Sequence, residues 1–495
     1  MTITIDELEK NLRSEFDVKI LCDLGNVSTG PDVLIRLLDS VYQEQYQNNV
    51  RLVFYTSHQL DDEFFRHLYE TFNFVDISNW FALICGPAEL EQSIASCCKQ
   101  FSTDPVSFQF QIVDLLPTKI VESNFKLSDT MCAIPWHNIE IRTNGNITPC
   151  CMSTSVLGNI QEITLEQAFH GNVMQQLRND LLSGKKPKEC NNCWKVEEKK
   201  LTSIRMHNVK RLKKDLLTKY LHNPQITNFD IKFNNTCNFK CRICDAGNSS
   251  LFAQEQHQFR NTPLVVQPNW SEDQTFVDQM ATHLPNIRNI DMFGGEPFLI
   301  KKFKEVLQLA VEQDYAKHIR LHYNSNGSIW PEHLLPFWPS FELVDIHFSI
   351  DAVGKQFDLQ RGGNWDNVEK NILRLRDLGL ANLSINIMPT ISVMNIYYID
   401  QVYEWAMAHG FPIFVSHYRG NGFALQHLTR QAKDMITEKY KNHPWKEMQN
   451  VLETLQHLPD NDGSAFQNKI QWFDQVRQEN FAKDHLEIAN AMRYI

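Results

Sequence analysis

Between residues 223 and 420, the sequence alternates six times between a short strand-like run and a helix-like segment. The runs are rich in β-branched and aromatic residues, and the segments between them carry apolar residues at helical spacing. Repeated strand–helix units favour a parallel sheet, closed or partly closed as a barrel, with chemistry at the carboxyl ends of the strands. The expected strands span residues 228–234, 286–294, 319–326, 343–351, 382–390 and 412–418.

The start of the chain shows the same alternation in the order β-α-β-α-β-α-β. It predicts a small parallel-sheet domain of βαβ type, without a glycine-rich phosphate loop. A chain of 495 residues exceeds what one core normally serves, so several domains are expected. We expect an N-terminal α/β domain (1–126) that could capture substrate, a cysteine-rich module with a basic helical linker (127–222), an α/β core (223–420) and a helical region without a readable motif (421–495).

The net charge of −11 argues against non-specific binding of nucleic acid, which needs a basic surface. The one dense basic run, at residues 210–219, is either a solvated helix face between domains or a docking site for an acidic peptide or nucleic acid. The first residues lack a signal-peptide pattern, and no apolar run reaches 18 residues. These features predict a cytoplasmic protein with no membrane span.

The chain has 12 cysteines, which in a cytosolic protein are more often metal ligands than disulfide partners. Cys22, Cys85, Cys97 and Cys98 lie in apolar contexts and are interpreted as buried small hydrophobic residues. The other eight fall into two groups with regular spacing.

The first group is Cys237, Cys241 and Cys244, directly after the first core strand. By composition, three cysteines at fixed offsets would arise by chance in fewer than about one in a hundred such chains. Thiolates in a compact loop suit zinc or an iron–sulfur cluster, and structural zinc requires four protein ligands. Three thiolates on a cluster would instead leave one iron free to bind a substrate or cofactor.

The second group contains Cys132, Cys150 and Cys151, followed by Cys190 and Cys193. Between them we expect a hairpin turning at Asn144–Gly145 and one helix over residues 164–184, with Thr164 as its N-cap. On chemistry alone, these thiols could hold zinc or an iron–sulfur cluster.

The Cys-x3-Cys-x2-Cys spacing resembles the signature of the radical S-adenosylmethionine (radical SAM) superfamily. The resemblance implies a partial (β/α)6 barrel and a 4Fe–4S cluster whose fourth iron binds the amino and carboxylate groups of SAM. Reductive cleavage of SAM would then yield a 5′-deoxyadenosyl radical that abstracts a hydrogen atom from the substrate. Gly294, Gly295 and Glu296 resemble the family's GGE motif, which meets the SAM amino group, and Ile243 holds the position that contacts adenine. The implied catalytic residues are the three cysteines and Glu296.

Further SAM contacts are implied at the ends of the next strands. Ser325 and Asn326 are candidates for the ribose, Ser349 and Asp351 follow the fourth strand, and Arg361 could clamp the SAM carboxylate. Each of these polar strand ends could equally be solvated without binding anything. The same holds for Tyr323, His347, His417 and Tyr418, which are interpreted as structural.

The second cysteine group resembles the twitch module, a shorter relative of the SPASM domain that holds one auxiliary 4Fe–4S cluster. The resemblance implies Cys132, Cys150, Cys190 and Cys193 as ligands, with Cys151 as a spare that could replace Cys150. Here the module precedes the core. Whether its cluster faces the active site or only stabilises the fold therefore stays open.

Enzymes with such modules often modify ribosomally made peptides, so we expect a radical SAM oxidoreductase that modifies a peptide or protein side chain (RiPP maturation). The alternative is dehydrogenation or carbon–carbon bond formation on a small-molecule precursor. Either reaction requires an external one-electron donor such as flavodoxin or ferredoxin. A non-catalytic metal-binding scaffold is the remaining hypothesis, and SAM cleavage would exclude it.

Overall fold

The computed structural model describes residues 18–23, 51–55, 128–198, 201–211, 220–221 and 223–495. The chain divides into two compact units, Met1–Lys126 and Leu127–Ile495, and each is described by itself. In the first unit, β1 (Val18–Asp23) pairs in parallel with β2 (Arg51–Tyr55). The other elements expected there lie outside the described residues, as do Cys85, Cys97 and Cys98, the side chain of Cys22, and most of the basic run at 210–219.

The second unit is built on a sheet of eight strands in the order β10-β9-β8-β7-β6-β3-β4-β5. Its five core strands are mutually parallel, which confirms the predicted α/β class with a large parallel sheet. They are β6 (Asn228–Lys232), β7 (Asn289–Phe293), β8 (Arg320–Ser325), β9 (Leu343–Phe348) and β10 (Leu383–Ile387). The helices between them are α10 (Ser250–Arg260), α11 (Gln274–His283), α12 (Phe303–Glu312), α13 (Gly354–Arg361) and α14 (Trp365–Arg376), and α15 (Ile399–Ala408) follows the last strand.

The expected sixth core strand is reduced to fragments, so this part of the prediction was wrong. β11 (Thr390–Ile391) and β12 (Ser416–His417) form a separate two-stranded ladder, and one isolated bridge joins Ile387 to Ile413. Two prolines explain the interruption, because Pro389 and Pro412 have no N–H to donate to a ladder. The regular parallel part of the core sheet therefore ends at β10.

The cysteine-rich segment contributes three strands to the same sheet. β3 (Asn138–Ile141) and β4 (Asn146–Thr148) form the predicted hairpin, and β5 (Gly158–Asn159) follows. Gly145 adopts the left-handed conformation that the turn requires, with φ +81°. β3 pairs in parallel with β6, so the hairpin extends the core sheet. Nothing in the local sequence pattern indicated this pairing.

Helices follow the hairpin, and the single helix expected over residues 164–184 is in fact two. They are α5 (Leu165–His170) and α6 (Asn172–Leu182), separated at Gly171, whose backbone is extended at φ −68° and ψ 162°. Thr164 is the N-cap as predicted, in a capping box with Gln167. Next come α7 (Asn191–Glu198) and α8 (Ile204–Arg211).

The C-terminal region is helical and packs against the core through buried residues such as Phe466, Ile470 and Phe473. Its helices are α16 (Arg430–Tyr440), α17 (Lys446–His457), α18 (Ser464–Arg477), α19 (Phe481–Asp484) and α20 (Leu486–Ala491). Within the described ranges, no helix combines the length and the apolar character that crossing a membrane requires.

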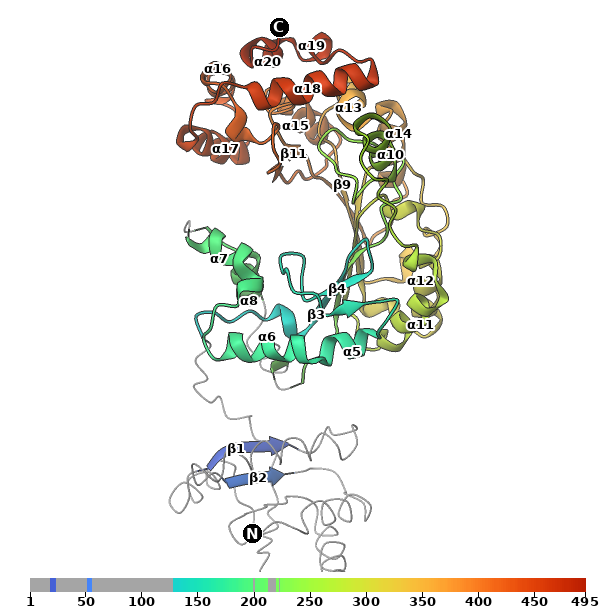
Figure 1. The fold of residues 1–495 in the computed structure, drawn as a ribbon. Coiled ribbons are helices and arrows are strands. Elements are labelled where there is room, and N and C mark those ends of the chain that lie inside the picture. Colours follow the sequence, from blue (N-terminus) through green and yellow to red (C-terminus); the bar gives the residue numbers. More distant parts are fainter. Residues whose placement is uncertain (1–17, 24–50, 56–127, 199–200, 212–219, 222) are drawn as a thin grey trace, which may run out of the picture. The chain divides into compact units, whose positions relative to one another are not determined.

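The two faces of the core sheet differ in chemistry. Successive strand residues alternate between full burial and partial exposure, as the period of two requires. The fully buried face is apolar: Tyr323, for example, packs against Phe298 and Trp338. Figure 1 shows α11 and α12 along the outer side of the sheet. The partly exposed face carries polar side chains in register across neighbouring strands, from Asp230 through Asp291 and His322 to Asp345.

Candidate functional site

The three closely spaced cysteines lie in the loop between β6 and α10, which we call the cysteine loop (residues 234–247). Cys237, Cys241 and Cys244 all line a cavity of about 210 Å³ at the carboxyl ends of the core strands. Residues at the carboxyl ends of β7, β8 and β9, or directly after them, complete its wall, as the fold class predicts. They include Gly294, Gly295, Asn324, Ser325, Asn326 and Ser349.

Cys241 is close enough to Cys237 and Cys244 to raise the pKa of both thiols. Burial is the main cause and raises the pKa of Cys237 to about 12, with the neighbouring Cys241 adding to the rise. Burial and the other two thiols also raise the pKa of Cys244. Three adjacent thiolates would therefore repel one another unless a cationic centre held them, as metal centres do when they deprotonate coordinating thiols.

The spacing of the thiols distinguishes between a single zinc ion and a cluster. A tetrahedral zinc site with bonds of about 2.3 Å would place its sulfurs only ~3.8 Å apart. Within the described residues, one group of at least three His, Cys, Asp or Glu side chains has all its ligand atoms within 4.8 Å of one another. That group contains no cysteine. Both cysteine groups are thus more open than one zinc ion requires, which fits a cluster whose thiolates bind different irons.

Two glycines allow the β7 loop to pass close to the cysteine loop. Gly294 and Gly295 have φ values of +72° and +54°, which disfavour side chains. A Cβ at Gly295 would lie 2.2 Å from the carbonyl oxygen of Thr236. The next residue donates its N–H to that same oxygen at 2.9 Å, so the glycines permit the direct contact between the two loops.

Glu296 lies behind the cavity wall and is fully buried, so it does not itself line the cavity. One carboxylate oxygen accepts hydrogen bonds from the Ser325 hydroxyl at 2.8 Å and from the Phe298 N–H at 3.2 Å. The other accepts from the Asn326 N–H at 2.7 Å. Burial raises the pKa of Glu296 to about 7, although these three hydrogen bonds oppose the rise.

Arg361 lines the cavity, and Asp351 positions it from behind. The guanidinium donates from Nη1 to Oδ2 of Asp351 at 2.5 Å, while Oδ1 of Asp351 accepts the Thr390 N–H at 2.7 Å. Burial alone would lower the pKa of Arg361, but Cys241 and Asp351 raise it, so the group stays cationic. Its buried Nε has no hydrogen-bond partner among the described residues, which fits an anionic ligand at this position.

The structure therefore gathers most, but not all, of the residues predicted to contact SAM. Ser325, Asn326, Ser349 and Arg361 line the cavity, whereas the side chains of Glu296 and Asp351 support the wall from behind. Ile243 is partly buried against the core and does not line the cavity.

The second cysteine group also converges in space. Burial raises the pKa of Cys132 to about 12, and the charges of Cys190 and Cys193 add to the rise. Burial raises the pKa of Cys150 as well, with Cys132 as the next cause. Four thiols from separate parts of the module thus interact, and we call them the second cysteine set: Cys132, Cys150, Cys190 and Cys193.

Cys151 also raises the pKa of Cys150, but it is exposed and lines a second cavity of about 380 Å³. This larger cavity lies between the hairpin module and the core sheet. Asn248, just beyond the cysteine loop, lines both cavities, so they adjoin. Its wall consists of Arg142, Thr143, Cys151, Met152, Ser153, Thr154, Asn192, Lys232 and Asn248.

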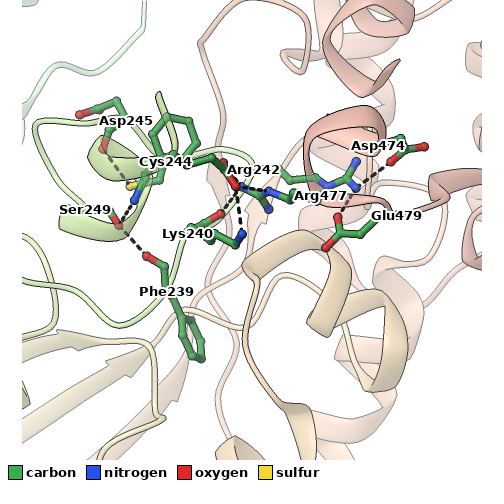
Figure 2. A network of polar contacts seen from close by, with 11 residues as sticks. Phe239, Lys240, Arg242, Cys244, Asp245, Ser249, Asp474, Arg477 and Glu479 are labelled. Atoms are coloured by element: carbon green, nitrogen blue, oxygen red, sulfur yellow. Dashed lines mark hydrogen bonds and ion pairs between the residues drawn. The ribbon is translucent and has the colours of Figure 1, made fainter. Parts of the chain in front are cut away.

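The cysteine loop is anchored by C-terminal helices in a way that sequence reasoning missed. Figure 2 shows Arg242, which is fully buried, reaching Asp474 of α18 at 2.8 Å and Glu479 at 2.6 Å. Arg477 of α18 donates to the Lys240 carbonyl at 2.7 Å. The only available signal was two basic residues between cysteines in an acidic chain, and it named no partner.

Comparison with known families finds a match for each of the two segments that carry these cysteine groups. The model of the radical SAM superfamily matches residues 231–406, and the model of an iron–sulfur cluster-binding domain, SPASM, matches residues 132–194. No curated protein matches the chain.

Solved structures show weaker similarity. Native anSMEcpe with bound AdoMet is 16% identical with a TM-score of 0.34, and the alignment covers 44% of this chain and 60% of that one. SuiB of Streptococcus suis, bound to the precursor peptide SuiA, is 11% identical with a TM-score of 0.31 and coverages of 54% and 59%. The chain thus spans about three fifths of each of these two proteins.

Proposed function

Since the chain is a radical SAM protein with a SPASM-like iron–sulfur domain, we propose that it modifies a side chain of a peptide or protein by radical hydrogen abstraction. The two domains imply a SAM-binding 4Fe–4S cluster, SAM itself and auxiliary iron–sulfur chemistry. When bound, these cofactors supply the one-electron cleavage of SAM that starts the reaction. A flavodoxin- or ferredoxin-type protein would deliver the electron.

The residues divide the remaining work among them. Cys237, Cys241 and Cys244 would hold the SAM-binding cluster at the smaller cavity. Arg361 would bind the carboxylate of SAM, since its guanidinium is cationic and has a free donor. The buried carboxylate of Glu296 would attract the SAM ammonium electrostatically from behind the cavity wall. It would also keep Ser325 and Asn326 in place through the hydrogen bonds that it accepts. The second cysteine set would hold the auxiliary cluster.

The observation that carries the substrate proposal is the larger cavity, which adjoins the smaller one at Asn248. Cys151, Thr154 and Asn192 on its wall are exposed, so the cavity opens to solvent. An open site of this kind suits one side chain of a longer molecule, whose remaining part stays outside. Cys151 and Asn192 also belong to the module that carries the second cysteine set, which supports an auxiliary cluster near the substrate.

An expected pH dependence follows from Glu296. With a pKa of about 7, its carboxyl is largely protonated at pH 6 and must lose the proton to interact with an ammonium. The affinity for SAM should therefore rise about fivefold from pH 6 to pH 7, as the ionised fraction grows. The stability of the SAM-free protein changes with pH in the opposite direction. Its free energy of unfolding falls as the pH rises from about 4.5 towards 7, because the folded state holds the Glu296 proton more tightly than the unfolded state does.

Anaerobic calorimetry of SAM binding at pH 6.0, 6.5 and 7.0 measures this dependence. Glu296→Gln should bind SAM at least about tenfold more weakly at pH 7, because it lacks the charge, and it should lose the pH slope. An unchanged slope in that variant would assign the titration to another group.

The substrate class can be tested with fractions from source cells that lack this protein. We expect the peptide fraction to stimulate formation of 5′-deoxyadenosine by the reconstituted enzyme with SAM and a reductant. The same fraction should lose its effect after protease digestion. Stimulation that survives digestion, or that resides in the small-molecule fraction, would replace the peptide proposal with small-molecule chemistry.

A further inference from the structure

Two histidines and an aspartate meet on the partly exposed face of the core sheet, apart from both cysteine groups. His322 lies on β8 directly opposite Asp345 of β9, and His347 follows two residues later on the same face. Oδ2 of Asp345 lies 3.0 Å from Nδ1 of His322 and 3.1 Å from Nε2 of His347. The three atoms form the one such group within 4.8 Å in the described part of the chain.

These separations are those of neighbouring ligands around one metal ion. Bonds of about 2.1 Å place two ligand atoms ~3.0 Å apart at right angles and ~3.4 Å apart at the tetrahedral angle of zinc, so small shifts of these side chains would admit either geometry. Two imidazoles and a carboxylate are a donor set that binds divalent transition metals and leaves coordination positions open. Here all three side chains come from neighbouring strands of a sheet, which holds them without a flexible loop.

Two asparagines orient this group in the way that supporting residues orient metal ligands. Asn386 of β10 donates to Oδ1 of Asp345 at 2.7 Å, which leaves Oδ2 directed at both imidazoles. Nε2 of His322 lies 3.2 Å from Oδ1 of Asn324, so this contact fixes the orientation of the ring and keeps its other nitrogen, Nδ1, on the Asp345 oxygen. Without a metal, Nδ1 of His322 shares a proton with the Asp345 carboxylate, and a bound cation would take the place of that proton between the two groups.

The group lies next to the cavity at the cysteine loop. Asn324 lines that cavity and follows His322 by two residues, and Ser349 lines it and follows His347 by two. Two residues of strand span about 6–7 Å. Phe293, also on the cavity wall, contacts the His322 ring with centroids 5.8 Å apart. A ligand bound by these three side chains would extend from the partly exposed face of the sheet toward the cavity.

We propose that His322, Asp345 and His347 bind one divalent transition-metal ion that is separate from both iron–sulfur clusters. The open positions of that ion would take an oxygen or nitrogen group of the substrate and hold the substrate beside the smaller cavity. The site replaces the structural interpretation of His347 that its sequence context favoured. Its existence does not depend on the identity of the substrate.

Equilibrium dialysis of the untagged, cluster-loaded protein against micromolar Zn²⁺ tests the site, with metal content measured by mass spectrometry. The wild type should retain one more zinc per chain than the variants His322→Asn, Asp345→Asn and His347→Gln. Asn386→Ala, which removes only the orienting hydrogen bond, should weaken zinc binding about 10–100-fold. Iron content and thermal unfolding, measured on the same samples, should be unchanged and so exclude misfolding.

His170→Asn is the matched control, because His170 forms an exposed pair with Glu166 on the surface. It should retain the extra zinc. Equal zinc content in the wild type and in all three ligand variants would overturn the proposal and leave a hydrogen-bonded triad. The dialysis uses neither SAM nor substrate, so its outcome is independent of the proposed reaction.

Discussion

Replacing Cys237, Cys241 and Cys244 together with alanine is expected to remove about four of roughly eight irons per chain and to abolish SAM cleavage. The three thiols lie on one loop and line one cavity, so they lose their ligand role as a unit. Without the cluster there is no centre from which an electron could reach SAM. Iron content after anaerobic reconstitution, and 5′-deoxyadenosine formed with SAM and dithionite, measure the two effects.

Replacement of the second cysteine set provides the comparison. Alanine at all four positions should also remove about four irons, but SAM cleavage should persist, because the smaller cavity keeps its lining. The single variant Cys151→Ala should keep all the irons, since Cys151 is exposed and lines the larger cavity. Cleavage that survives loss of the first group would contradict the assignment of that group. Loss of iron in Cys151→Ala would make Cys151 a ligand.

Arg242→Met is expected to destabilise the second unit by about 3 kcal/mol and to reduce the iron retained by the cysteine loop. Arg242 is fully buried and pairs with Asp474 and Glu479, so its loss leaves two carboxylates near the interior without their cation. The loop would also lose its link to α18, shown in Figure 2. Denaturant unfolding and iron content before and after dialysis measure the two consequences.

The matched control is Arg430→Met, because Arg430 forms an exposed pair with Asp434 at 3.0 Å. Exposed pairs of this kind contribute little to stability, so iron content and unfolding should stay close to the wild type. Adding Asp474→Asn and Glu479→Gln to Arg242→Met should restore part of the stability by removing the unpaired charges. Equal stability of Arg242→Met and Arg430→Met would show that the anchor is unimportant.

The candidate residues of the site could be named from the sequence because their pattern is local. The spacing of Cys237, Cys241 and Cys244 places three thiols in one turn of loop, whatever the rest of the chain does. Strand ends are also local, which is why Ser325, Asn326 and Ser349 were expected at the cavity they line. The prediction of a continuous sixth strand was wrong because Pro389 and Pro412 interrupt the hydrogen-bond ladder of a segment whose composition is typical of a strand.

Contacts between segments that are distant in the sequence could not be predicted, because no local pattern indicates them. Arg242 meets residues more than 230 positions away, and any of the chain's many acidic side chains could have been its partner. His322 and Asp345 face each other only because β8 and β9 pair in one register, and a shift of one residue would separate them.

By itself, the sequence determined the α/β class and the order of the modules, and it predicted which groups bind metal and SAM, because these depend on residue type and short-range periodicity. Only the tertiary structure decided that β3 joins β6, so that the hairpin module and the cysteine loop border adjoining cavities. It also decided that C-terminal helices hold the loop and that two strands bring an aspartate between two histidines. Strand register and helix packing fix these distances, and both result from burying apolar surface across the whole unit, which no local pattern specifies.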